Sequence, residues 1–336
     1  MLYELSQSYK RIAIVGMAKN AGKTTTLNYF LEEAMDEEMV VGVTSTGRDG
    51  ERTDLVTGTD KPSIWLEEDT LVSVPVQLYD LADAGLEILR KTEYGTSLGP
   101  ILLCRVANSG FVQVAGPVIN SQHESLCREM IGAGAEVVLI DGAIDRKSIA
   151  APETSDAIIL STGAVISRQM NTVIEETAHT GGLYRLPRLE EGPVREGLEK
   201  FRDDDKILLA EGGEIRHLDL RTGLGAGKIL AATIGKDVSH VFLPGAFTPG
   251  SIDGIDPRTM RELTFVLKDP TKIFFPPSLW RKMCKWGLDV KVLENINVAA
   301  VTVNPTSPQG YRFDQQQLVE GVQRALPDIP VIDVMA

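Results

Sequence analysis

A lysine and a threonine that could bind phosphate and magnesium follow a glycine near the amino terminus. Residues 16–25 read Gly-Met-Ala-Lys-Asn-Ala-Gly-Lys-Thr-Thr, so the loop has a glycine on each side. In such loops, backbone N–H groups converge on a polyphosphate at the positive end of the next helix. Lys23 would contact the outer phosphates as a point charge, and the Thr24 hydroxyl would ligate the accompanying Mg²⁺. The spacing therefore predicts a nucleotide site.

The segments on both sides of this loop are those that a phosphate-binding loop requires. Residues 12–15 are Ile-Ala-Ile-Val, an apolar run typical of a buried strand. After the loop, Leu27, Phe30 and Leu31 recur at the spacing of one helix face. The alternative is an ordinary turn that contains Gly-Lys-Thr, but the flanking strand and helix favour the phosphate loop. The expected nucleotide contacts are Gly16, Lys19, Asn20, Ala21, Gly22, Lys23, Thr24 and Thr25.

The loop is one residue longer than the commonest phosphate-binding loop. Its form is Gly-x-x-x-x-x-Gly-Lys-Thr, because the first glycine stands at position 16 and not at position 17. This form resembles the loop of the dethiobiotin synthetase and cobyric acid synthase branch of the phosphate-loop proteins. It is also similar to the deviant loop of MinD-like ATPases, although Lys19 stands one residue nearer to Lys23 than the second lysine of those proteins.

A carboxylate follows a second strongly apolar run, Val-Val-Leu-Ile at residues 137–140. Such a strand carries its final acid to the carboxyl edge of the sheet, where phosphate-loop enzymes bind magnesium. We expect Asp141 to contact the metal directly or through water, whereas an ordinary Asp-Gly turn is the alternative. Asp145 and Arg146 could then sense the γ-phosphate or stabilise its developing charge, or they could belong to a charged surface loop.

Three more carboxylates follow the apolar run at residues 40–44. Asp49, Glu51 or Asp54 could supply another metal contact, and Asp49 is the first choice because it lies closest to the run. Taken together, the expected metal ligands are Thr24, Asp49 and Asp141, and the expected catalytic residues are Lys23, Asp145 and Arg146.

An asparagine in the last part of the chain could contact the base of the nucleotide. Asn304 follows the apolar run 298–303 and could face an adenine ring, although a rigid turn at the strand exit also explains an asparagine before a proline. The chain has no Asn-Lys-x-Asp motif for reading guanine, so ATP is the expected nucleotide.

The composition excludes some classes of partner. The formal charge of −13 argues against nonspecific nucleic-acid binding and against docking on an anionic membrane. The chain has 336 residues, of which 43% are hydrophobic, and can bury a large core. Its three cysteines are far apart and suit a reducing compartment. No apolar stretch typical of a signal peptide stands at the start, so we expect a cytoplasmic protein.

Apolar runs of strand length alternate with helical segments along most of the chain. This pattern predicts an α/β protein with a mainly parallel sheet flanked by helices, and the phosphate loop predicts the P-loop NTPase fold within it. A charged stretch at 190–206 is the expected boundary between a nucleotide-binding domain, 1–190, and a carboxyl-terminal α/β portion, 205–336, which could also continue the same sheet. We further expect helices at 78–89 and 314–326 and a strand at 273–275.

Three segments together resemble a narrower family. They are residues 16–25, residues 47–51 (Gly-Arg-Asp-Gly-Glu) and residues 141–148 (Asp-Gly-Ala-Ile-Asp-Arg-Lys-Ser), and residues 304–308 are also similar. They look like the ATPase subunit of the reactivating factor that accompanies adenosylcobalamin-dependent lysine 5,6-aminomutase in lysine fermentation. The resemblance implies an ATPase that binds ATP and Mg²⁺ and acts with a second reactivase subunit on the aminomutase. Together they would release damaged cobalamin, so that adenosylcobalamin can replace it.

Two other functions stay open at this point. One is an ATP-dependent synthetase or kinase of the dethiobiotin synthetase type, which activates a small carboxylate by phosphorylation. The other is an assembly ATPase for a metal or cofactor centre. A reactivase or assembly ATPase should hydrolyse ATP faster with its protein partner, whereas a synthetase should turn over with a small molecule alone. The sequence leaves open whether the chain forms a homo-oligomer.

Overall fold

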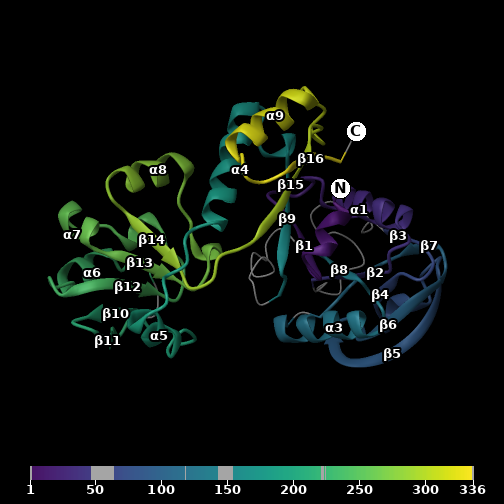
Figure 1. Ribbon diagram of the computed structural model, residues 1–336, viewed down its shortest axis with the longest axis horizontal. Coiled ribbons are helices and arrows are strands. Elements are labelled where there is room, and N and C mark those ends of the chain that lie inside the picture. Colours follow the sequence, from purple (N-terminus) through teal and green to yellow (C-terminus); the bar gives the residue numbers. More distant parts are fainter. Residues whose placement is uncertain are drawn as a thin grey trace. The chain divides into compact units, whose positions relative to one another are not determined.

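The computed structural model describes residues 2–46, 64–117, 119–142, 154–220, 223 and 225–334. The chain divides into two compact units: unit 1 comprises Met1–Thr177 and Asn297–Ala336, and unit 2 comprises Ala178–Ile296. In each unit helices flank a mixed sheet, which confirms the α/β class (Figure 1). Within the described ranges, no helix has the length and apolar character needed to cross a membrane.

Unit 1 is built on a nine-stranded sheet. Pairing is parallel from β16 through β4, and β6 and β5 add an antiparallel hairpin at one edge. The sheet is therefore mixed, because the short connection between β5 and β6 can join only antiparallel strands. In spatial order the strands are β16 (Val331–Asp333), β15 (Val298–Asn304), β9 (Ala157–Gly163), β1 (Arg11–Gly16), β8 (Val137–Asp141), β2 (Val41–Ser45), β4 (Leu71–Pro75), β6 (Gly99–Asn108) and β5 (Gly85–Thr96).

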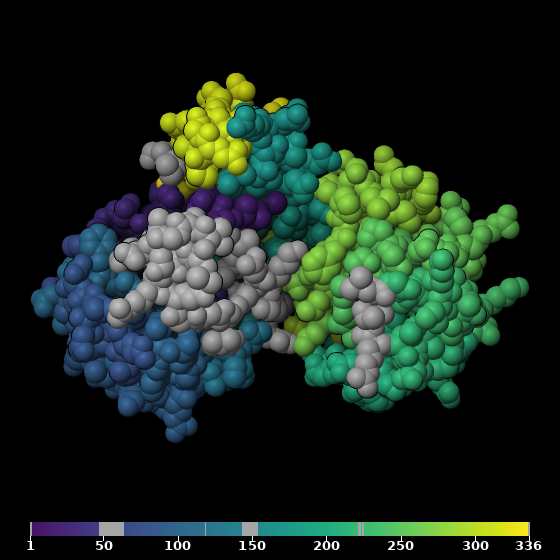
Figure 2. Space-filling view, turned by 180° about the vertical axis from the view of Figure 1, so that it is seen from behind, coloured from purple at the N-terminus to yellow at the C-terminus, as the bar shows by residue number. Residues whose placement is uncertain are grey.

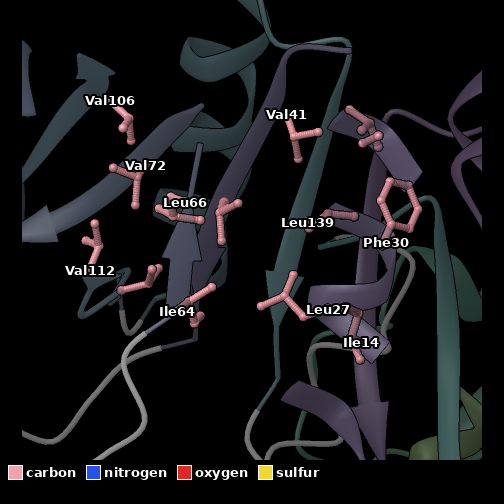
Figure 3. Close-up of a cluster of buried hydrophobic side chains, with 14 of the residues drawn as sticks. Ile14, Leu27, Phe30, Val41, Ile64, Leu66, Val72, Val106, Val112 and Leu139 are labelled. Carbon is pink, nitrogen blue, oxygen red and sulfur yellow. The ribbon is translucent and has the colours of Figure 1, made fainter. Parts of the chain in front are cut away.

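Two helices, α1 (Lys23–Asp36) and α3 (Asn120–Gly132), cover opposite faces of this sheet. Leu27 of α1 belongs to the same core as Leu139 of β8, and Figure 3 shows both side chains in that core. Met130 of α3 lies against the other face, because a Cβ on Gly42 would be 3.2 Å from its sulfur and 3.1 Å from Cγ2 of Val138. Adjacent residues of a strand point to opposite faces, so Val138 and Leu139 face different helices. The other elements of unit 1 are η1 (Tyr3–Gln7), β3 (Ile64–Leu66), α2 (Val76–Tyr79), β7 (Gly110–Val112), η3 (Ala164–Ile166), α4 (Met170–Tyr184), which runs on into unit 2, and α9 (Gln315–Ala325).

The helix expected at 78–89 is wrong. Only α2 is helical there, and the chain enters the long strand β5 at Gly85. The leucines have helical spacing, but Leu81 is 52% exposed and Leu89 is 39% exposed, so they do not form one buried face. Pairing with β6 satisfies the backbone of this segment and decides its conformation.

The last helix agrees with its prediction. The Asp314 carboxylate accepts a hydrogen bond from the Gln317 N–H at 2.8 Å and so caps α9. Pro327 follows the end of the helix. A Cβ on Gly321 would lie 2.4 Å from Cδ1 of Ile174, so α9 packs closely on α4. Figure 2 shows this contact as the yellow carboxyl-terminal segment lying beside teal residues.

Unit 2 is a smaller α/β unit with a five-stranded sheet in the order β11-β10-β12-β13-β14. Its core contains an aromatic group in which the ring of Phe247 lies 5.3 Å from that of Phe265 and 5.0 Å from that of Phe275. The strand expected at 273–275 is wrong, because Ile273 makes only an isolated bridge with Phe247. The elements are α5 (Pro193–Glu199), β10 (Leu208–Glu211), β11 (Glu214–His217), α6 (Gly227–Thr233), β12 (Val238–Leu243), η4 (Pro249–Ser251), α7 (Pro257–Glu262), β13 (Thr264–Leu267), η5 (Pro270–Lys272), α8 (Pro277–Lys285) and β14 (Asp289–Val292).

The boundaries of the units differ from the expected division into 1–190 and 205–336. The charged stretch at 190–206 lies inside unit 2, where the buried Arg195 donates to the carbonyls of Leu189 at 2.7 Å and Leu293 at 3.2 Å. These hydrogen bonds of Arg195 connect α5 to the rest of unit 2. Residues 297–336 return to unit 1, where β15 and β16 extend the sheet beside β9.

Replacing Leu27 with alanine should destabilise unit 1 by about 2–5 kcal/mol, because the change leaves a cavity in a closed core. The matched control is Leu81→Ala, which removes the same atoms from an exposed site of the same unit and should cost less than about 0.5 kcal/mol.

Alkylation during denaturant unfolding measures this effect for unit 1 alone. Cys104 and Cys127 are buried in unit 1, and burial raises the pKa of each thiol to about 12, so both react only after unfolding. Cys284 is exposed and lies in unit 2. If alkylation of Cys104 and Cys127 gives the same unfolding midpoint for Leu27→Ala as for Leu81→Ala, the assignment of Leu27 to the core is contradicted.

Candidate functional site

The loop that is expected to bind phosphate starts from the middle of the unit 1 sheet. It joins β1, which ends at Gly16, to α1, which begins at Lys23. β1 lies between β8 and β9 and is parallel to both. From β1 the chain passes through α1 to β2, which lies beyond β8. The next strand of this sheet after β9 is β15, which lies on the opposite side of β9 from β1, so the two connections run in opposite directions. Parallel α/β sheets bind ligands at the carboxyl edge where connections diverge in this way.

Two residues in left-handed conformation shape the loop. Asn20 has φ 63° and Gly22 has φ 99°. Glycine and asparagine adopt this conformation with less strain than other residues. Gly22 also precedes α1 and provides no capping side chain for its first-turn N–H groups. Such an amino terminus suits an anion, because backbone donors and the helix dipole both favour negative charge there.

The side chain of Lys23 lies back across the start of the loop. A Cβ on Gly16 would be only 2.9 Å from Cγ of Lys23 and 3.1 Å from its Nζ. The lysine is half-buried. Glycine at position 16 therefore makes room for the lysine side chain, and the ammonium group is held over the loop.

Three buried hydroxyl groups lie beneath the loop. Thr26 Oγ1 lies 2.7 Å from Thr302 Oγ1 and 3.2 Å from Ser161 Oγ, and Thr302 donates to Ser161 at 3.0 Å. Ser161 also accepts a hydrogen bond from the Met17 N–H through its carbonyl at 2.9 Å. Strands β9 and β15 thus fix both ends of the loop. The sequence analysis did not include Thr26, Ser161 or Thr302; for Ser161 and Thr302 the available signal was a hydroxyl residue near the carboxyl end of an apolar strand.

Asn304, at the end of β15, lies against the loop. A Cβ on Gly22 would be 3.2 Å from Cβ of Asn304 and 3.6 Å from its Nδ2. The side-chain carbonyl of Asn304 accepts from the Thr306 N–H at 2.9 Å, which makes the turn considered above. Gly163 was also missed: a Cβ there would lie 2.2 Å from the Asn304 carbonyl oxygen. Only glycine allows β9 and β15 to approach each other so closely.

Asp141 ends β8 beside the loop strand. In the sheet it is the register partner of Ile14 on β1 and of Ser45 on β2. Its carbonyl accepts from the Thr46 N–H at 3.0 Å, and the Gly142 N–H donates to the Ile14 carbonyl at 3.1 Å. The predicted carboxylate therefore lies at the carboxyl edge of the sheet, one strand away from the loop.

The residues present fit a magnesium ion better than a metal held by protein alone. In the part of the chain that the structure describes, no group of three or more His, Cys, Asp or Glu side chains could hold a metal. Mg²⁺ usually takes one or two protein ligands and keeps its other positions for water and phosphate oxygens. Thr24 in the first turn of α1 and Asp141 at the end of the adjacent strand are a donor set of that size.

Five expected site residues lie outside the described ranges. The last described residues before the two gaps, Thr46 and Gly142, lie at the carboxyl ends of β2 and β8. The residues that lie outside the described ranges are Asp49, Glu51, Asp54, Asp145 and Arg146.

Comparison of the chain with protein-family models, with curated proteins and with solved structures finds no match. The interpretation of the site depends on its own residues and their geometry.

Replacing Gly163 with alanine should weaken nucleotide binding about tenfold and destabilise unit 1 by about 1–3 kcal/mol, because the new methyl group must push the end of β15 away from β9. Titration calorimetry with Mg-ATP and thermal unfolding measure the two effects. The control is Gly95→Ala, since a Cβ on Gly95 meets nothing within 4 Å. If the Gly163 variant behaves like this control, the tight junction of the two strands has no part in the site.

Proposed function

We propose that the chain is a magnesium-dependent ATPase with the P-loop NTPase fold, and that residues 16–25 bind the phosphates of ATP. The observation that carries the proposal is the Lys23 side chain, which lies across Gly16 in the loop between β1 and α1. An ammonium group is strongly hydrated, and in an ordinary turn it would extend into water. A loop that holds it over an uncapped helix start is suited to a polyanion.

Each described residue has a role that follows from its chemistry. The Lys23 ammonium group would stabilise negative charge that develops on the outer phosphates. The Thr24 hydroxyl and the Asp141 carboxylate would hold Mg²⁺, which supplies charge neutralisation on the phosphate oxygens when it is bound. The side chain of Asn304, which lies next to Gly22, would face the adenine ring of the nucleotide. The remaining proposed residues are Gly16, Lys19, Asn20, Ala21, Gly22 and Thr25 for phosphate contacts, Asp49 for the metal, and Asp145 and Arg146 for the γ-phosphate.

We further propose that the ATPase acts in the cytoplasm as one subunit of a reactivase for lysine 5,6-aminomutase. With a second reactivase subunit, it would release damaged cobalamin so that adenosylcobalamin can bind. The support is the combined resemblance of residues 16–25, 47–51 and 141–148. The nucleotide would act by shifting the ends of β2 and β8, where the Thr46 N–H donates to the Asp141 carbonyl and the Gly142 N–H donates to the Ile14 carbonyl.

Substitutions of Lys23 and of Asp141 should impair ATP hydrolysis in different ways. Lys23→Ala should lower the rate of ATP hydrolysis about 10²-fold or more at any magnesium concentration, because the positive charge that stabilises the outer phosphates is lost. Asp141→Asn keeps the shape of the side chain and should mainly raise, about tenfold, the Mg²⁺ concentration needed for half-maximal hydrolysis. Steady-state hydrolysis titrated with Mg²⁺ separates the two effects. No binding of Mg-ATP by the wild-type protein at millimolar nucleotide would refute the proposed site.

The reactivase role is tested by recovery of inactivated enzyme. Lysine 5,6-aminomutase that has lost activity through turnover or oxygen should regain it with fresh adenosylcobalamin, Mg-ATP, the second reactivase subunit and this protein. Recovery should require every component and should fail with Lys23→Ala. Equal recovery without this protein would exclude the reactivase role, and ATP turnover with a small carboxylate alone would favour the synthetase.

A further inference from the structure

A groove runs along the carboxyl-terminal half of α1. It encloses a cavity of about 540 Å³ that is lined by α1 and by the segment that contains β3 and residues 67–70. In Figure 1, α1 and β3 lie side by side. Its apolar lining includes Leu31 and Met35 from α1 and Trp65 from β3. We call this surface the α1–β3 groove. It is separate from the loop at the other end of α1.

The apolar surface of the groove is exposed and continues beyond the cavity. Met35 is 49% exposed and Trp65 is 48% exposed. The ring of Phe111 on β7, itself 46% exposed, packs edge-to-face on Trp65 with 5.1 Å between ring centroids. The Trp65 indole N–H donates to Glu67 at 2.7 Å, which holds the ring in this position. Fixed aromatic rings and an adaptable methionine are typical of surfaces that bind proteins.

The rim of the groove is negatively charged. Among the residues that the structure describes, five carboxylates and no lysine or arginine line it: Glu32, Glu38, Glu67, Glu68 and Asp69. Asp69 pairs with Arg105 at 3.3 Å, and Ser109 and Trp65 both donate to Glu67, which lowers the pKa of that carboxyl and keeps it ionised. An apolar floor between carboxylates is complementary to a segment that carries apolar side chains on one face and lysine or arginine beside them.

We propose that the α1–β3 groove is the docking surface for a cationic amphipathic segment of a partner protein. A small organic cation would use the cavity alone, whereas the apolar surface continues from Met35 over Trp65 to Phe111. The identity of the partner rests on the proposed function: it is the protein on which the ATPase acts. α1 joins the two sites, because its first turn carries Lys23 and Thr24 and its last turns line the groove.

The test uses the full chain and a synthetic helical peptide of about 16 residues with leucine on one face and lysine on the other. Its binding is followed by fluorescence anisotropy of a label on the peptide. The wild-type protein should bind this peptide and should not bind a second peptide in which every lysine is glutamate. The double variant Glu32→Lys with Glu68→Lys should bind the cationic peptide at least about tenfold more weakly, because like charges then face each other across the groove.

A matched double variant separates the groove from the overall negative charge. Glu214→Lys with Glu262→Lys changes the net charge equally at exposed sites of unit 2 and should keep wild-type affinity for the peptide. Equal loss in both double variants, or equal binding of the two peptides, would overturn the docking proposal.

Separate measurements can refute the docking proposal and the nucleotide proposal. Lys23→Ala should retain the peptide affinity while it loses ATP hydrolysis. Trp65→Ala should lose peptide affinity while Mg-ATP binding, measured by calorimetry, is unchanged. Wild-type peptide affinity in Trp65→Ala would overturn the docking proposal and leave the ATPase proposal standing. If the wild-type protein binds the peptide but not Mg-ATP, the ATPase proposal is overturned and the docking proposal stands.

Discussion

The candidate site depends on one row of residues across three parallel strands. Gly16, Ser161 and Thr302 are register neighbours on β1, β9 and β15, and Thr26 of α1 closes the row through its hydroxyl group. A buried hydrogen bond contributes only about 0.5–1.5 kcal/mol, but a buried hydroxyl that loses its partner costs about 1–3 kcal/mol. α1 is therefore held at one height above the sheet, and the position of the loop before it follows from that height.

This constraint makes distant parts of the chain members of one site. The loop comes from the first residues, Asp141 from the middle of the chain, and Thr302 and Asn304 from the segment that follows unit 2. Residues 178–296 thus form an insertion between two strands that are neighbours in the sheet. The glycine at position 163 lets those strands meet, since any side chain there would collide with the Asn304 backbone.

The same helix that positions the loop also lines the α1–β3 groove. α1 has 14 residues, which corresponds to a length of about 21 Å. Its buried residues Leu27 and Phe30 pack on the sheet between its two ends. α1 therefore connects the proposed nucleotide site to the groove, and any coupling between the two sites would be reciprocal: a nucleotide at the first turn and a partner at Met35 would change each other's affinity by the same factor.

Local sequence determined the parts of this protein whose signals lie within a few residues. The glycines around the loop, the apolar strand before Asp141 and the Asp314 cap of α9 all specify their own conformation, and the structure has β1, β8 and α9 where those signals stand. Those signals also brought Lys23 and Asp141 to one edge of the sheet. Tertiary structure decided the rest. Residues 85–96 carry leucines at helical spacing yet form β5, because β6 satisfies their backbone. Residues 297–336 return to the first sheet, and Asn304 reaches Gly22, because β15 pairs with the edge of β9 that faces away from β1. Pairing between distant strands depends on both partners at once, so the periodicity of either segment alone cannot predict it.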